Sequence, residues 1–457
     1  MLEDYIAVWA NKHPDKLAVI DKDQTLTYSQ LLQQVEARKR QLAVAGLREG
    51  MAMPLTATTG ADFLISYFAA HLLGAAVAPL APQTSNIKLQ TSNFKLQISD
   101  LLFTTGTTGK SKGVMLSHEA ILADADNLVH AHGYTPDLTF ILTGPLNHLG
   151  SLSKIWPTLM VGATLHIVES IKDSNPFFQA IDRAPGKVAT FLVPANIKML
   201  ITFSKKQLEQ RAAKIDFLET GAAPISEADI HELCRILPAT RLFNTYASTE
   251  TGIVCTFNFN YHPSPSKDQS SNLKSQISNL KSQISNLKSL QGCVGKPMKN
   301  SSVFITPDGT VACKGKTLMT GYYNDDDLTA QVLRDGVVYT HDQGYIDEHG
   351  CLHLAGRTDD IINVGGYKVN PIEVENTALT CPFVADCVCV PSPHPVLGTT
   401  LHLIVVTRDN EPLDKRALAT FLASKLDHYK LPQRFSQTDK LKRTFNGKLD
   451  RKAYQIK

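Results

Sequence analysis

The chain has 457 residues, of which 43% are apolar and 19% charged, and its formal net charge is +3. This length allows two or three domains with a large core. The near balance of charge, without a basic run that contains aromatic residues, excludes binding to nucleic acid through a basic surface. The eight cysteines are scattered, which is typical of free thiols in a reducing compartment, and the N-terminus lacks the apolar stretch of a secretory signal. We therefore expect a cytoplasmic protein.

The segment 63–82 is as long as a membrane helix and contains no Asp, Glu, Lys or Arg. However, His71 lies near its middle, and Gly74 and Pro79 interrupt it. We expect a buried helix up to Leu73, a turn at Gly74 and then a strand, and therefore no integral membrane segment.

Further along the chain, helical periodicity alternates with short apolar runs, which indicates layered α/β structure. A helix is expected at 27–45, ending at Gly46. Strands are expected at the following runs: 163–168, 188–193 and 241–246. After residue 300 the pattern changes to hairpins, with turns at 307–309 and 348–350. The alternation of Cys387 and Cys389 with apolar residues predicts a buried strand in preference to a metal site.

The predicted fold class is therefore α/β, with two domains. A large N-terminal domain of layered α/β subdomains covers residues 1–356, and a small C-terminal α+β domain covers residues 357–457. Two segments, 84–99 and 271–289, share a repeat of seven residues. Their polar composition favours repeat expansion within surface loops over a short coiled-coil seam.

The segment 101–118, LLFTTGTTGKSKGVMLSH, is one residue short of the Walker phosphate-loop pattern, because Thr104 stands where the first glycine is required. The apolar run 113–116 is a poor helix start, and Ser117 is a better N-cap. We therefore expect the loop to connect two strands, 100–103 and 113–116. Its backbone N–H groups, hydroxyl groups and lysines can still bind phosphates.

Three other places carry polar groups suited to a nucleotide site. Thr249 and Glu250 directly follow an expected strand, at the end where ligands of α/β proteins bind. A carboxylate there could bind Mg²⁺. Asp342 lies in an expected turn, and Arg357 follows the second hairpin.

Taken in order, these segments resemble the adenylate-forming superfamily of acyl-CoA synthetases, luciferases and peptide-synthetase adenylation domains, over nearly the whole chain. The segment 103–118 is similar to its phosphate loop, 246–250 (YASTE) to its Tyr-Gly-x-Thr-Glu motif, and 443–451 (RTFNGKLDR) to its C-terminal lysine motif. The resemblance implies catalytic roles for Lys448, Thr249, Glu250 and His148, with Glu250 as the Mg²⁺ ligand. It also implies ATP-binding roles for the following residues: Thr104, Thr105, Gly106, Thr107, Thr108, Gly109, Lys110, Lys112, Gly221, Ala222, Ala223, Asn244, Thr245, Tyr246, Asp342 and Arg357.

The resemblance further implies a mobile C-terminal domain that turns about Asp359. The turn would bring Gly365 and Gly366 to the path of the CoA thiol. The implied reaction joins a carboxylic acid to ATP as acyl-AMP, releases pyrophosphate, and transfers the acyl group to CoA.

The sequence departs from the family pattern at three places. Ala247 replaces a glycine of the Tyr-Gly-x-Thr-Glu motif, and His341 replaces the glycine before the aspartate that binds ribose. The stretch between Pro82 and the phosphate loop is shortened, which leaves the packing of this region in question.

The segment 144–154 resembles the lining of the acyl pocket, with His148 near the substrate carboxylate; a structural histidine is the alternative. It contains no Asp or Glu that could pair with a substrate ammonium, so we expect a small-molecule carboxylic acid without an α-amino group. Fatty, aryl and succinylbenzoate-type acids are all compatible with this. For Lys154, a solvated side chain is favoured over one that faces a second substrate carboxylate.

Two alternatives to an acid–CoA ligase remain open at this point. The chain could load a separate carrier protein, although no carrier domain follows Lys457, which favours CoA. It could also be a non-catalytic nucleotide-binding paralogue, given the repeats and the shortened region. The presence of Thr249, Glu250, Asp342, Arg357 and Lys448 argues against that second alternative.

Overall fold

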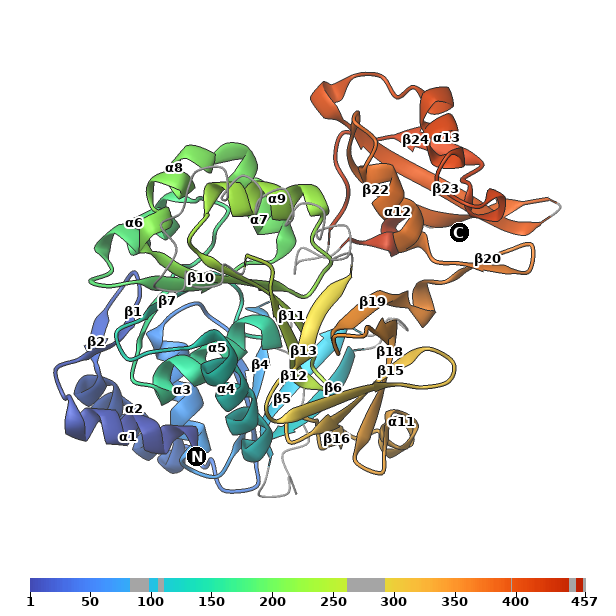
Figure 1. Ribbon diagram of the computed structural model, residues 1–457. Helices are drawn as coiled ribbons and strands as arrows, with labels where there is room; N and C mark the ends of the chain where they lie inside the picture. Colours follow the sequence, from blue (N-terminus) through green and yellow to red (C-terminus); the bar gives the residue numbers. More distant parts are fainter. Residues whose placement is uncertain (83–97, 106–110, 261–291, 396, 444–448, 455–457) are drawn as a thin grey trace.

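The computed structural model describes all residues except 83–97, 106–110, 261–291, 396, 444–448 and 455–457. The described residues form a large α/β body and a smaller C-terminal region that lies to one side of it (Figure 1). The predicted fold class is confirmed. Most of the first seven-residue repeat and all of the second fall outside the described residues.

The described part of the body contains one sheet of fourteen strands. It is parallel from β11 to β1 and antiparallel at both ends. In spatial order its strands are β14 (Ser301–Ile305), β15 (Thr310–Gly315), β18 (Val337–Ile346), β19 (Leu352–Arg357), β13 (Cys293–Pro297), β12 (Gly252–Asn258), β11 (Arg241–Ser248), β10 (Ile215–Gly221), β9 (Val188–Phe191), β7 (Thr139–Leu142), β8 (Thr164–Ile167), β1 (Leu17–Ile20) and β2 (Thr25–Thr27), with β17 (Leu333–Arg334) beside β18.

Helices cover both faces of the parallel part of this sheet (Figure 1). One face carries α6 (Asn175–Arg183), α7 (Pro194–Phe203), α8 (Lys205–Gln210) and α9 (Glu227–Ile236), and the other carries α3 (Ala61–His71), α4 (His118–His132) and α5 (Leu149–Met160). Successive residues of β7 point to opposite faces of the sheet. Phe140 and Leu142 belong to the hydrophobic core that contains α3–α5, and Ile141 belongs to the core that contains α6–α9. The other α-helices among the described residues of the body are α1 (Leu2–Lys12), α2 (Tyr28–Val44) and α11 (Asp326–Val332).

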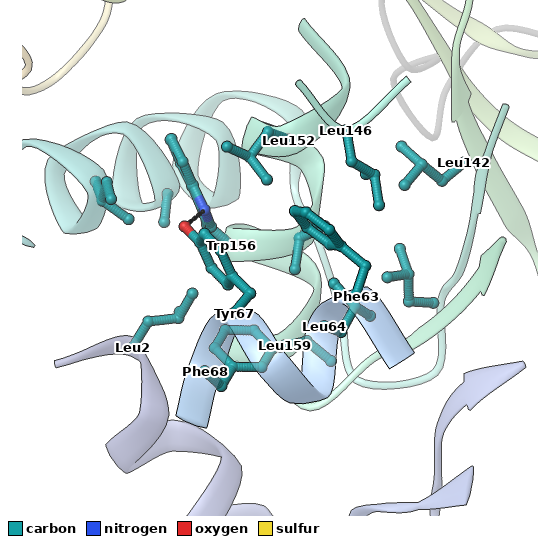
Figure 2. Packing of buried hydrophobic residues seen from close by; sticks show 14 of the residues in the cluster. Leu2, Phe63, Leu64, Tyr67, Phe68, Leu142, Leu146, Leu152, Trp156 and Leu159 are labelled. Atoms are coloured by element: carbon teal, nitrogen blue, oxygen red, sulfur yellow. Dashed lines mark hydrogen bonds between the residues drawn. The ribbon is translucent and has the colours of Figure 1, made fainter. Parts of the chain in front are cut away.

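A second sheet closes the far side of α3–α5. Its strands, in order, are β16 (Gly321–Tyr322), β6 (Ser111–Ser117), β5 (Ile98–Thr105), β4 (Ala76–Leu80) and β3 (Ala52–Thr56). Between the sheets, Phe63 and Tyr67 of α3 pack with Trp156 of α5, whose Nε1 donates to the Tyr67 hydroxyl at 3.2 Å (Figure 2). These layers therefore share one continuous hydrophobic core.

Local signals in the sequence set several element boundaries correctly. Gly74 turns the chain with φ 71° between α3 and β4, as predicted for segment 63–82. Among the described residues, no helix combines the length and apolarity needed to cross a bilayer. Ser117 caps α4 by accepting from Ala120 N at 3.1 Å, and Gly309 and Gly350 turn the two predicted hairpins with positive φ.

The C-terminal region has its own core. Two small sheets, β20–β21 and β22–β23–β24, pack with α12 and α13. The bounds are β20 (Ile362–Val364), β21 (Tyr367–Val369), α12 (Pro371–Leu379), β22 (Val384–His394), β23 (Gly398–Thr407), α13 (Lys415–Ala423) and β24 (Arg434–Gln437). Cys387 and Cys389 are buried in β22, as predicted. A hydrogen bond from Lys198 Nζ of α7 to Ala385 O of β22, at 2.7 Å, links this region to the body.

All eight cysteines lie among the described residues, and all are free. Six of them are buried, and Cys234 and Cys351 are half-buried. Burial raises the pKa of the Cys234 thiol to about 11 and also raises the pKa of the Cys351 thiol.

Candidate active site

The carboxyl ends of β10 and β11 lie side by side and bring two predicted segments together. Gly221, the last residue of β10, pairs with Thr245 of β11. A Cβ on Gly221 would lie 2.6 Å from Thr245 O, so only glycine fits this approach. Ala222 follows with φ 67°, a left-handed conformation that is unusual for alanine. The predicted residues 221–223 and 244–246 therefore form one rim at this sheet edge.

Tyr246 and Asp342 meet across the sheet. The Tyr246 hydroxyl donates to Asp342 Oδ2 at 2.6 Å, and Asp342 pairs with Arg357 between β18 and β19. Arg357 Nη1 lies 3.5 Å from Asp342 Oδ1, with the Arg357 side chain 44% exposed. Burial, and then the charge of Asp342, raise the pKa of Tyr246 well above its usual value, so this hydroxyl remains a hydrogen-bond donor. The arrangement leaves a carboxylate and a guanidinium side by side at the edge of the sheet.

Glu250 lies in the turn after β11 and is held by β16. Its Oε1 accepts from the Tyr322 hydroxyl at 2.9 Å, and its backbone O accepts from Met319 N at 2.9 Å. The described residues offer no hydrogen bond to Glu250 Oε2, and the side chain is half-buried. A partly exposed carboxylate oxygen of this kind fits the oxygen coordination that Mg²⁺ requires. Thr249, the preceding residue, is also half-buried.

The same strand that holds Glu250 borders the phosphate-loop hairpin. β16 pairs with β6, and Lys112 Nζ of β6 lies 5.7 Å from the centre of the Tyr322 ring. In the hairpin, Thr104 pairs with Lys112 and Thr105 with Ser111, which confirms that the loop connects two strands. The loop residues Gly106, Thr107, Thr108, Gly109 and Lys110, the Thr105 side chain and Lys448 lie outside the described residues.

The predicted acyl segment begins α5. His148 is the N-cap residue of α5, and its Nε2 lies 3.4 Å from Asn147 Nδ2. Phe191, at the end of β9, lies between this segment and the rim, because Cβ atoms on Gly150 and Gly221 would lie 3.2 and 3.9 Å from its ring. An aromatic ring therefore separates the start of α5 from the end of β10.

The prediction that Lys154 is solvated is wrong. Lys154 is 1% exposed, and its Nζ donates to Glu219 Oε1 at 2.6 Å. The ammonium also lies 5.0 Å from the centre of the Phe191 ring. Glu219 Oε2 lies 3.6 Å from His132 Nδ1. Burial of a lysine requires such a partner, and Glu219 lies 65 residues away in the sequence.

The predicted hinge residue Asp359 lies beside His341 and Arg357, whereas the predicted thiol-path glycines belong to the C-terminal region. His341 Nδ1 is 3.2 Å from Asp359 Oδ1, and Arg357 Nη2 is 3.9 Å from Asp359 Oδ2. The unusual His341 therefore faces the predicted pivot. Gly365 and Gly366 form the turn between β20 and β21, with φ 55° and 97°, within the separate C-terminal region (Figure 1).

Sequence reasoning did not single out Tyr322, Phe191 or Glu219. Phe191 and Glu219 could have been found because both lie at or near the carboxyl ends of parallel strands, where ligands bind. No signal in the sequence identified Tyr322, because its contact with Glu250 depends on the pairing of β16 with β6.

Comparisons with known proteins match both parts of the chain. The AMP-binding enzyme family matches residues 6–92 and 95–323, and the AMP-binding enzyme C-terminal domain matches residues 373–448. Indoleacetate–CoA ligase of Aromatoleum aromaticum is 29% identical over 360 residues, which are 76% of this chain and 65% of that protein. The fatty acid–[acyl-carrier-protein] ligase ScoC of Streptomyces coeruleorubidus is 30% identical over 368 residues, which are 77% of this chain and 66% of that protein. The chain thus spans just under two thirds of these two relatives.

Solved structures share the fold over almost the whole chain. ATP-bound MatB from Rhodopseudomonas palustris has a TM-score of 0.83 at 21% identity, covering 99% of each chain. The o-succinylbenzoate CoA synthetase MenE of Bacillus subtilis, in complex with the acyl-adenylate intermediate OSB-AMP, has a TM-score of 0.78 at 21% identity, covering 99% of this chain and 98% of that one.

Proposed function

Because this chain belongs to the AMP-binding enzyme family, as its motifs predicted, we propose that it is an acid–CoA ligase. It activates a carboxylic acid with ATP to an acyl-adenylate and transfers the acyl group to the CoA thiol. The observation that carries the proposal is the convergence of Tyr246, Asp342 and Arg357 at the sheet edge where Glu250 also lies.

Each part of ATP has a matching group in this proposal. The adenine lies along the rim formed by residues 221–223 and 244–246. Asp342 accepts hydrogen bonds from the ribose hydroxyl groups, held in place by the Tyr246 hydroxyl, while Arg357 lies beside it. Residues 104–110 and Lys112 bind the β- and γ-phosphates through N–H groups, hydroxyl groups and positive charge. Thr249 contacts the α-phosphate.

In the first step, a carboxylate oxygen of the acid attacks the α-phosphorus of ATP. The bond from that phosphorus to the bridging oxygen breaks, and pyrophosphate leaves. Two anions must approach each other, so the barrier depends on compensating positive charge. Lys448 supplies an ammonium at the transferring phosphoryl group, and His148 orients the acid. Mg²⁺ held by Glu250 would neutralise phosphate charge.

In the second step, the thiol of CoA loses its proton to solvent and its sulfur attacks the acyl carbon. The bond from this carbon to the phosphate oxygen breaks, and AMP leaves. Residues 1–356 and 357–457 act as two domains, and the C-terminal one turns about Asp359. This turn moves Lys448 away and brings Gly365 and Gly366 to the path of the thiol.

The acid is proposed to be an apolar monocarboxylic acid without an α-amino group. Segment 144–154 carries no carboxylate for an ammonium, and Glu219 already compensates the charge of Lys154. A second carboxylate on the substrate would therefore find no unpaired cation at Lys154. Phe191, beside Gly150 and Gly221, provides an apolar surface that suits an aliphatic or aromatic acid.

Transfer to a carrier protein is the second candidate. The observation that favours it is the 30% identity to ScoC, which is a fatty acid–[acyl-carrier-protein] ligase. The chemistry of the first step is the same for both candidates, and only the acceptor thiol differs.

Pyrophosphate release across a panel of acids, with and without CoA, tests the proposal. We expect release with a subset of apolar acids and acyl-CoA product only when CoA is present. Acyl-AMP that reacts with an acyl-carrier protein but not with CoA would favour the second candidate. No pyrophosphate with any acid from a folded protein would indicate a non-catalytic paralogue.

A further inference from the structure

A buried cluster of ionisable side chains lies away from the proposed active site. Glu3 of α1 and His71 at the end of α3 are 3% and 2% exposed, and His118, the first residue of α4, is half-buried. One donor atom from each of the three lies within 4.8 Å of the other two. His71 and His118 meet edge to face, with ring centroids 5.3 Å apart.

Hydrogen bonds within the body do not fully satisfy this cluster. His71 Nδ1 contacts Glu3 Oε1 at 2.8 Å, while Glu3 Oε2 is buried and has no hydrogen-bond partner among the described residues. Asp100 is fully buried beside His71, and its Oδ1 likewise has no hydrogen-bond partner among them. Unpaired buried carboxylate oxygens are costly, and a bound ion or an ordered water molecule would satisfy them.

We propose that Glu3, His71 and His118 bind a divalent transition-metal ion, for which zinc is the best fit. Two imidazoles and one carboxylate are a common protein ligand set for zinc. Metal–ligand distances of about 2.0–2.2 Å place tetrahedral donors about 3.4 Å apart. The three donor atoms now lie within 4.8 Å of one another, and His71 Nδ1 lies 2.8 Å from Glu3 Oε1, so metal binding requires a modest rearrangement of the side chains. Glu3 Oε2 or a water molecule is available for the fourth position.

The surroundings of His71 also suit a metal ligand. With the metal on Nδ1, beside Glu3, the opposite ring nitrogen Nε2 faces Ser99 O at 3.2 Å and Asp100 Oδ1 at 3.6 Å. Metal-bound imidazoles typically donate their second N–H to a carbonyl or carboxylate in this way, which fixes the ring. Asp100 is itself held by the Tyr67 hydroxyl, which donates to Oδ2 at 2.8 Å.

The position of the cluster suggests a structural ion. Asp100 lies at the start of β5, and His118 directly follows β6, so both lie at the base of the phosphate-loop hairpin. The loop lies about 17 Å away along the strands, at a rise of about 3.3 Å per residue. A zinc ion bound by Glu3, His71 and His118 would therefore link α1 and α3 to the base of the hairpin, and it would not contact the substrate.

The test measures zinc binding by the full chain after treatment with a chelator and desalting. Wild type should bind one equivalent of zinc more than His118→Ala in equilibrium dialysis, and its thermal midpoint should rise with zinc. Loss of a group that merely supports a ligand costs about 10- to 100-fold in affinity, so loss of His118 should cost at least as much. His130→Ala, an exposed histidine of the same helix, is the matched control and should behave as wild type.

Two further measurements keep the result interpretable. Glu3→Gln keeps the size of the side chain and should also lose affinity, which guards against misfolding of His118→Ala as the cause. Co²⁺ should give visible d–d absorption without a thiolate charge-transfer band, which separates this site from the cysteines. Equal zinc stoichiometry and equal thermal shifts in wild type and His118→Ala, or no zinc bound by wild type, would overturn the proposal.

Discussion

Tyr246 and Asp342 lie 96 residues apart in the sequence, yet the tyrosine hydroxyl donates to the aspartate at 2.6 Å. Both residues belong to the same continuous sheet. The position of the carboxylate is therefore set by backbone pairing, by this hydroxyl group and by Arg357, whose Nη1 lies 3.5 Å from Asp342 Oδ1. The contribution of this hydroxyl group to ATP binding can be measured by removing it.

Tyr246→Phe removes the hydroxyl group and keeps the ring. A hydrogen bond to a charged group contributes about 1.5–3 kcal/mol, so we expect KM for ATP to rise about 10- to 100-fold, with a smaller change in kcat. Pyrophosphate-release kinetics measure both constants. Tyr345→Phe is the control, because Tyr345 is an exposed tyrosine of β18, the strand that contains Asp342. An unchanged KM for Tyr246→Phe would mean that Asp342 does not need this support.

Lys448→Ala and Gly366→Leu should separate the two half-reactions. The ammonium is useful while charge is transferred at the α-phosphate, and loss of such a stabiliser costs about a hundredfold or more. Lys448→Ala should therefore fail with ATP and acid, yet convert supplied acyl-AMP and CoA to thioester. Gly366→Leu should do the reverse, because its side chain would obstruct the thiol path.

Gly398→Leu is a matched control for Gly366→Leu. Both glycines have positive φ, and a Cβ on either would meet no atom within 4 Å, so both substitutions strain the backbone in open space. Gly398→Leu should leave thioester formation nearly unchanged. Single-turnover assays of each half-reaction decide the matter; if Lys448→Ala slowed both halves equally, a two-conformation mechanism would be wrong here.

Lys154→Met should destabilise the body, because it leaves Glu219 buried and unpaired. Breaking a buried ion pair in this way costs about 3–5 kcal/mol. Trp156 lies in the same helix, so tryptophan fluorescence during urea unfolding reports on this region. The double variant Lys154→Met/Glu219→Gln should recover part of the loss.

Lys22→Met is the control, because it breaks an ion pair at the surface. The side chains of Lys22 and its partner Glu169 are 61% and 67% exposed, so the free energy of unfolding should change by at most about 1 kcal/mol. If Lys154→Met and Lys22→Met lowered the free energy of unfolding equally, the assignment of Lys154 and Glu219 as a buried ion pair would be wrong.

Excision of residues 271–289 should leave kcat/KM within about threefold of wild type, because halving a loop changes its closure free energy by only about 0.6 kcal/mol. β12 and β13, which flank this segment, are antiparallel neighbours, so the residues that remain can form the connection. A much larger loss from a folded deletion variant would show that the repeat has a structural role.

The element boundaries could be predicted because they depend on the residues next to them. Contacts between side chains that lie far apart in the sequence could not be predicted. Ser117, Gly74 and Gly309 each act through the geometry of their own few residues, and the structure agrees with the prediction at all three. Lys154 of α5 was predicted to be solvated, but its partner Glu219 lies 65 residues away on β10. Nothing in the sequence near residue 154 indicates this partner. Glu3 and His71 likewise lie 68 residues apart in the sequence, and only the tertiary structure brings them together.

The burial of the native thiols makes the chain suitable for site-specific fluorescent labelling. Six cysteines are buried, and the two half-buried ones have raised pKa values, so thiol reagents should react slowly with all eight near neutral pH. Ala228→Cys on α9 and Ala417→Cys on α13 would place one exposed thiol in each part of the molecule. A dye pair at these positions would report the separation of the C-terminal region from the body during turnover, without prior removal of any native cysteine.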